Sequence, residues 1–199
     1  MKRLVFICLA LGVLSFALCK TIRNLRANNK ISTGKEVGQI VDSLNGVYVY
    51  YNGSVDHVDG RNTTSDNYNL GLKYQCVEFV KRYYYQHLHH RMPDSYGHAK
   101  DFFDPSFKDG QLNTKRGLRQ YSNPGKTKPK VNDLLIFSGT IFNKYGHVAI
   151  VSRVTDTEIE IVQQNPGPLA SSRETIRLKK ENDRWKINNG RILGWLRKE

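Results

Sequence analysis

Cysteine is scarce in this chain: it occurs three times in 199 residues, at Cys8, Cys19 and Cys76. The first two lie in or at the edge of an N-terminal apolar run, which leaves Cys76 as the one cysteine that follows it. A chain with a single cysteine forms no internal disulfide. If the protein is exported, its odd thiol is a candidate reactive group.

Long apolar runs are also scarce, and the clearest covers residues 4–18, directly after Met1-Lys2-Arg3. Two basic residues, a short apolar core and small residues near its end are typical of a secretory signal peptide, which we place at residues 1–19. The run is too short to span a bilayer, so we expect an exported protein, periplasmic or secreted, whose mature form has no membrane span. A lipoprotein acylated at Cys19 is the alternative, although Leu18 stands where that signal takes a small residue.

Acidic residues are the third shortage, because 18 Asp and Glu are set against 31 Lys and Arg, giving a formal net charge of +13. Removal of the proposed signal lowers this charge to about +11. The natural anionic partners of a basic exported protein are cell-wall polymers and membrane surfaces. Export and the lack of a nucleic-acid-binding signature argue against nucleic acid as a partner.

The rest of the chain predicts a single α+β domain at residues 46–199, because one helix precedes a series of strands. Residues 20–45 read as a polar linker with a short helix at 36–44. Residues 104–130 are polar and rich in Gly, Pro, Lys and Arg, so we expect a long loop there. The predicted strands are residues 47–51, 134–137, 147–151, 158–161, 173–178 and 192–196.

Cys76 begins the predicted helix, which should end near His90, ahead of a proline. Apolar residues follow it at spacings of three, four, seven and eight, which is the period of a helix with one buried face. The helix N-terminus carries a partial positive charge that favours a thiolate, the form of cysteine that attacks carbonyl groups. The alternative is that Cys76 is a small buried apolar residue.

A nucleophilic cysteine needs a base, and the base needs a partner that fixes its tautomer. His147 opens an apolar strand directly after a glycine, so its ring can emerge at the strand end. Gln163 and Asn165 end the next strand. If the two strands form a hairpin, an amide oxygen from one of these residues can accept a hydrogen bond from the imidazole of His147.

These residues lie in four motifs that resemble, in order and spacing, the CHAP family of cysteine- and histidine-dependent amidohydrolases and peptidases. The motifs are Tyr74-Gln75-Cys76-Val77-Glu78-Phe79, Asn132-Asp133-Leu134-Leu135-Ile136-Phe137, Gly146-His147-Val148-Ala149-Ile150-Val151 and Gln163-Gln164-Asn165. The closing Ile192-Leu193-Gly194-Trp195 is similar to the amidase domain of glutathionylspermidine synthetase/amidase, a close relative of that family. The resemblance implies a papain-like α+β fold, with the cysteine helix packed on an antiparallel sheet.

The resemblance also implies a mechanism in which His147 deprotonates Cys76 and the thiolate attacks an amide carbonyl to give an acyl-enzyme. The backbone N–H of Cys76 is then a natural oxyanion donor, and the side chain of Gln75 a second one. Gln163 stands where relatives often have Glu, so we expect Asn165 to orient His147, as an Asn does in papain-like enzymes. A second departure is Asn132, which replaces a usual Gly and tolerates left-handed backbone nearly as well.

The substrate class most consistent with export is peptidoglycan, or another anionic wall polymer, cut at an amide bond. Lys115, Arg116 and Arg119 are the candidate contacts to such a polymer. Two alternatives stay open: a non-catalytic wall-binding protein with a degenerate site, and an amidase on a small glutathionylspermidine-like amide. The sequence leaves open which amide bond is cut and the oligomeric state.

A metal site is the last alternative, since His87 and His90 are three residues apart and can share one face of the helix. No cysteine or carboxylate motif accompanies them, so a solvated helix end is the simpler interpretation. We expect neither a metal nor a cofactor.

Overall fold

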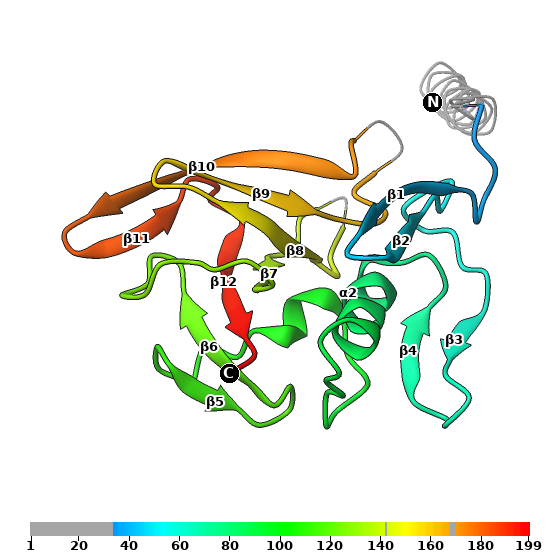
Figure 1. Cartoon of the computed structure of the whole chain (residues 1–199), viewed down its shortest axis with the longest axis horizontal. Helices are drawn as coiled ribbons and strands as arrows, with labels where there is room; N and C mark the ends of the chain where they lie inside the picture. Colours follow the sequence, from blue (N-terminus) through cyan, green and yellow to red (C-terminus); the bar gives the residue numbers. More distant parts are fainter. Residues whose placement is uncertain (1–33, 142, 168–169) are drawn as a thin grey trace, which may run out of the picture. The chain divides into compact units, whose positions relative to one another are not determined.

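A single antiparallel sheet, with strands in the order β11-β10-β9-β8-β7-β12-β6-β5, dominates the computed structural model, which describes residues 34–141, 143–167 and 170–199 (Figure 1). The predicted signal peptide and Cys19 lie outside these ranges. Residues 35–199 form one compact unit. The strands of the sheet are β5 (Gln111–Asn113), β6 (Leu118–Ser122), β7 (Leu134–Phe137), β8 (His147–Val154), β9 (Glu158–Val162), β10 (Arg173–Glu181), β11 (Arg184–Ile187) and β12 (Ile192–Arg197).

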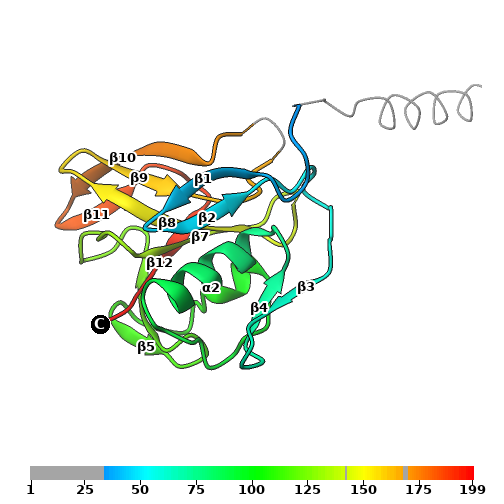
Figure 2. The same ribbon diagram turned by 45° about the vertical axis from the view of Figure 1, so that its right-hand side comes forward.

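Two separate hairpins and two short helices complete the described fold. The hairpins are β1 (Ile40–Leu44) with β2 (Val47–Tyr50), and β3 (Arg61–Thr63) with β4 (Asn69–Leu72). The helices are α2 (Cys76–Gln86) and the 3-10 helix η1 (Ala99–Phe102). Figures 1 and 2 show α2 along one face of the sheet, between the sheet and the β3–β4 hairpin, and it contacts β8, β4 and β2. The predicted α+β arrangement of a helix on an antiparallel sheet is therefore confirmed.

The apolar residues of the central strands alternate between two cores. Leu134, Ile136 and Ile150 face α2, where they meet Phe79 and Tyr83. The other face carries a second cluster that includes Leu135, Ala149, Val151 and Trp195. Both faces are covered, which explains why β7 and the start of β8 read as unbroken apolar runs. Each large apolar side chain buried in this way contributes roughly 1.5–3 kcal/mol.

Most of the predicted strands are confirmed, but several segments around them have a different secondary structure from the one predicted. Residues 40–44 form a strand rather than a helix, because Asn45 and Gly46 (φ 48° and 81°) make the left-handed turn of a hairpin. The expected loop at 104–130 contains β5 and β6, and β11 was not predicted. Helix α2 ends at Gln86 and not near His90, with His89 left-handed at φ 50° shortly after it. Asn132 adopts the left-handed conformation, which Asn tolerates nearly as well as Gly, at φ 74°.

Candidate active site

Cys76 is the first residue of α2, as its sequence pattern predicts. The chain enters the helix through Tyr74, a left-handed residue at φ 63°, and Gln75, which is extended and caps the helix. The face that begins at Cys76 packs on the core, and Cys76 as a whole residue is only partly exposed.

The thiol of Cys76 is less acidic than a helix N-terminus alone would make it. Backbone N–H groups of Val148, Val77 and Cys76 bond to the sulfur and lower its pKa, but burial outweighs them and raises the pKa to about 11. The resting group at neutral pH is therefore a thiol, which corrects the expectation of a stabilised thiolate. Since Val148 directly follows His147, the sulfur lies beside the start of β8.

His147, a residue only 8% exposed, contacts the side chain of Gln163 through its ring. Its Nε2 lies 2.9 Å from Gln163 Oε1, and the Gln163 amide nitrogen donates to the carbonyl of Ser171 at 3.2 Å. Because that second bond fixes which end of the amide faces His147, Nε2 must carry the proton. The neutral ring therefore keeps its free lone pair on Nδ1, the atom available to act as a base.

Burial also decides the charge of His147, lowering its pKa to about 4 despite the hydrogen bond that the ring donates to Gln163, which acts in the opposite direction. Gly146 places this residue: at φ 77° it brings the chain so close to β7 that a Cβ would lie 2.6 Å from the Phe137 carbonyl oxygen. His147 is thus a neutral imidazole at a strand start that accommodates only glycine before it, and the neutral thiol of Cys76 contacts the backbone N–H of the following residue, Val148.

Asn165 forms its hydrogen bonds with Gln75 and Val55, and not with His147 as expected. Its Nδ2 donates to Gln75 Oε1 at 2.8 Å and to the Val55 carbonyl at 3.2 Å. Gln163, and not Asn165, is therefore the hydrogen-bonding partner of His147, which corrects the sequence-based assignment. Gln75 in turn donates to the carbonyls of Val55 and His57, at 3.1 and 2.8 Å. Both amide hydrogens of Gln75 are engaged in this state, so it can serve an oxyanion only by releasing one of them.

Gln164, to which the sequence analysis assigned no role, links the start of α2 to strand β2. It is fully buried and donates to the Gln75 carbonyl at 3.0 Å and to Glu78 Oε2 at 2.9 Å. Its oxygen accepts from the Tyr50 N–H at 2.8 Å. Glu78 also forms a buried ion pair with Arg82, at 2.6 Å. Gln163 and Gln164 are adjacent in the chain but their side chains form different contacts. The Gln163 side chain contacts His147, and the Gln164 side chain holds the start of α2.

The three basic residues proposed to contact substrate do not act as a group. Arg116 is 1% exposed, donates to the carbonyls of Asp94 and Tyr96, and lies over the Phe102 ring at 3.9 Å. It holds a loop in place and is not available to a polymer, which corrects that assignment. Lys115 and Arg119 are exposed, but Arg119 pairs with Glu199. Strands β7 and β12 separate β6, which carries Arg119, from β8 and His147.

Two other kinds of site, a metal site and a membrane span, concern the described residues as well. No group of three or more His, Cys, Asp or Glu side chains there could hold a metal ion, and His90 instead approaches the Arg116 carbonyl at 2.8 Å. Among the same residues, no helix is long and apolar enough to cross a membrane.

Several known proteins are similar to part of this chain. Trypanothione synthetase from Crithidia fasciculata is 29% identical over 116 residues, which cover 58% of this chain and 18% of that protein. The bifunctional glutathionylspermidine synthetase/amidase from Escherichia coli is 29% identical over 147 residues, which cover 68% and 23%. The chain thus spans about a fifth of the length of these relatives. The crystal structure of Ly7917 reaches a TM-score of only 0.36 at 12% identity, over 63% of this chain and 53% of that one, which is too low to bear on function.

The match that decides the family covers the candidate site. The CHAP domain profile matches residues 64–165, a span that contains Cys76, His147 and Gln163. This span is about half of the chain, and membership implies an amidase or peptidase, a hydrolase of amide bonds. This protein belongs to the CHAP domain family.

Proposed function

We propose that this protein is an exported cysteine amidase or endopeptidase that cuts an amide bond in the peptides of the bacterial cell wall. The observation that carries the proposal is the hydrogen bond between His147 Nε2 and Gln163 Oε1, at 2.9 Å. It leaves Nδ1 free as a base on the residue next to Val148, whose N–H bonds to the Cys76 sulfur.

The reaction begins with Cys76 as a neutral thiol and His147 as a neutral imidazole. Nδ1 of His147 takes the thiol proton as the sulfur of Cys76 attacks the amide carbonyl, and the backbone N–H of Cys76 stabilises the oxyanion. The imidazolium gives its proton to the departing amine, leaving a thioester between the acyl group and Cys76. His147 then deprotonates a water molecule that attacks the thioester and restores the thiol.

The wall as substrate is supported by the signal-like N-terminus and the net charge of +13. An exposed cationic surface is drawn to anionic wall polymers over a screening length of about 8–10 Å. Exposed residues such as Lys115 and Arg119 can contribute to this attraction away from the reacting groups.

Purified peptidoglycan treated with the protein, followed by mass spectrometry of the released fragments, tests the proposal and identifies the bond. New amino termini in the peptide stems or bridges would support it. Wall that is bound but not cut would support instead the non-catalytic wall-binding alternative, in which Gln163 in place of Glu marks a lost activity.

A second candidate is an amidase on a small amide similar to glutathionylspermidine. It is favoured by the alignment of 147 residues with the bifunctional synthetase/amidase. Release of free spermidine from glutathionylspermidine, with no release of wall fragments, would favour this candidate over the wall.

A further inference from the structure

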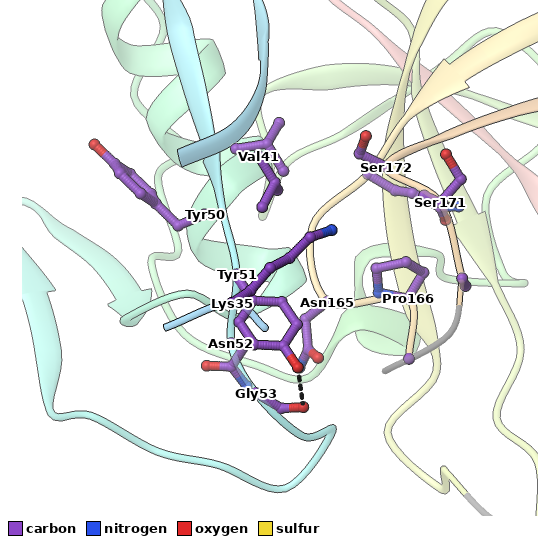
Figure 3. Close-up of a pocket in the computed structure, with 14 residues that line it drawn as sticks. Lys35, Val41, Tyr50, Tyr51, Asn52, Gly53, Asn165, Pro166, Ser171 and Ser172 are labelled. Atoms are coloured by element: carbon purple, nitrogen blue, oxygen red, sulfur yellow. Dashed lines mark hydrogen bonds between the residues drawn. The ribbon is translucent and has the colours of Figure 1, made fainter. Parts of the chain in front are cut away.

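We propose that a cavity next to the candidate active site is a substrate subsite for a group that carries a carboxylate. This inference rests on the proposed function and names the part of the substrate that the cavity receives. The cavity has a volume of about 280 Å³ and opens between the end of β2 and the segment that follows β9 (Figure 3).

The cavity shares its wall with the residues that organise the site. Gln163, which orients His147, and Asn165, which holds Gln75, both line it. Tyr51 and Asn52 form part of the opposite wall, and Ser171 and Ser172 belong to the segment beyond Asn165. A substrate whose amide carbonyl lies at Cys76 can therefore place a neighbouring group in this cavity.

The charge of the cavity selects the ligand. Among the residues that line it, Lys35 is the one with a side chain charged at neutral pH, and in Figure 3 its ammonium nitrogen reaches toward the side of Ser172. No carboxylate of the described residues forms an ion pair with Lys35, whose ammonium nitrogen lies over the Tyr51 ring, 5.9 Å from the ring centroid. Lys35 is therefore a cation at the edge of a polar cavity, and its ammonium group can still bind a carboxylate.

The described acidic residues beside the lining, Glu36 and Asp42, form no ion pair with this cation. Asp42 follows the lining residue Val41, but its carboxylate is held by Arg173 at 2.9 Å and by the Ser172 hydroxyl at 2.8 Å. These partners lower the pKa of Asp42 despite the burial that opposes them, and they occupy its oxygens. A carboxylate on the substrate is the chemistry that completes the cavity, since Lys35 offers it an ammonium and Ser171 a hydroxyl.

Binding can be measured without turnover. The full chain carrying Cys76→Ala, labelled with ¹⁵N, is titrated with N-acetyl-L-alanine and with N-acetyl-L-alaninamide, two probes that differ only in the carboxylate. We expect the acid to shift amide signals of the cavity wall, such as those of Gly53 and Ser171. We expect it to bind about two- to five-fold more tightly than the amide, the range of a partly exposed ion pair.

The preference must depend on Lys35. Adding Lys35→Ala should abolish the difference between the two probes, while the control Lys108→Ala, an exposed lysine in the loop before β5, should leave it unchanged. Equal binding of the two probes, shifts outside the cavity wall, or a preference that survives Lys35→Ala would overturn the subsite. Failure of the wall-digestion assay alone would instead refute the proposed substrate, because this titration needs no catalysis.

Discussion

Replacing Gln163 with Glu places a carboxylate where an amide oxygen now accepts the Nε2 proton of His147, at 2.9 Å. An amide offers only a partial charge to an imidazolium, whereas a carboxylate offers a full one. The variant Gln163→Glu should therefore raise the pKa of His147 from its present value of about 4, and should make Nδ1 a stronger base.

The size of the effect follows from the contacts on both sides of Gln163. A close opposite charge in a buried site moves a pKa by about one to three units. The gain should fall in the lower part of that range, because the second carboxylate oxygen would face the Ser171 carbonyl, to which the Gln163 amide now donates at 3.2 Å. A rise of about one to two units stabilises the imidazolium by about 1.4–2.7 kcal/mol, or at most about 10- to 100-fold in rate.

The same change should alter how stability depends on pH. Folding lowers the pKa of His147 below its ordinary value of 6.5, so the unfolded chain binds the proton more tightly. The native state therefore loses about 3 kcal/mol as the pH falls from about 6.5 to about 4, and nothing further from this group below that window. Gln163→Glu should reduce that loss.

NMR titration of the His147 ring in the wild type, Gln163→Glu and the control Gln163→Leu measures the pKa directly. Urea unfolding at pH 7 and pH 4.5 measures the stability. A His147 pKa in Gln163→Glu that is equal to or below that of the wild type would refute the role given to Gln163.

Three further predictions concern the same site. The value of kcat/KM should rise with pH through about 4 and then stay level to about pH 10, because a neutral His147 and a protonated Cys76 are the reacting forms. A rate that continues to rise toward pH 11 would mean that the thiolate is the reacting form. Gly146→Ala should lower kcat at least about 10-fold, since its Cβ would approach the Phe137 carbonyl and displace the next residue, and unchanged turnover would disprove the fit. Gln164→Ala should lower the unfolding free energy by about 2–4 kcal/mol, because the Gln75 carbonyl and Glu78 would each lose a buried hydrogen bond. A loss of less than about 0.5 kcal/mol would contradict this network.

The positions of the two candidate catalytic residues could be predicted from the sequence, because local patterns carry that information. Helical spacing after Cys76 and the glycine before His147 put both residues at the ends of elements, and the structure has them there. The residue types of Asn45-Gly46 also favour a hairpin turn, and such a turn predicts a strand and not a helix at residues 40–44.

The roles of the amides could not be predicted, because they depend on contacts between distant parts of the chain. Gln163 and Asn165 are two residues apart, and the choice between them is made by the β8–β9 register, which has an irregularity after Val151, and by the left-handed turn at Asn165. The burial of Arg116 likewise depends on Phe102 and on a loop whose carbonyls turn inward. A charge pattern along the sequence carries no sign of such contacts.

The central claim, that Cys76 is the nucleophile of an amide hydrolase, is tested most directly by comparing wild type and Cys76→Ala on purified peptidoglycan. Loss of one sulfur at an intermediate-exposure position should leave the fold intact, which the amide NMR spectrum of the variant can verify. We predict that the wild type releases peptide fragments with new amino termini and that the folded variant releases none. Equal release of fragments by the folded Cys76→Ala protein would contradict the account.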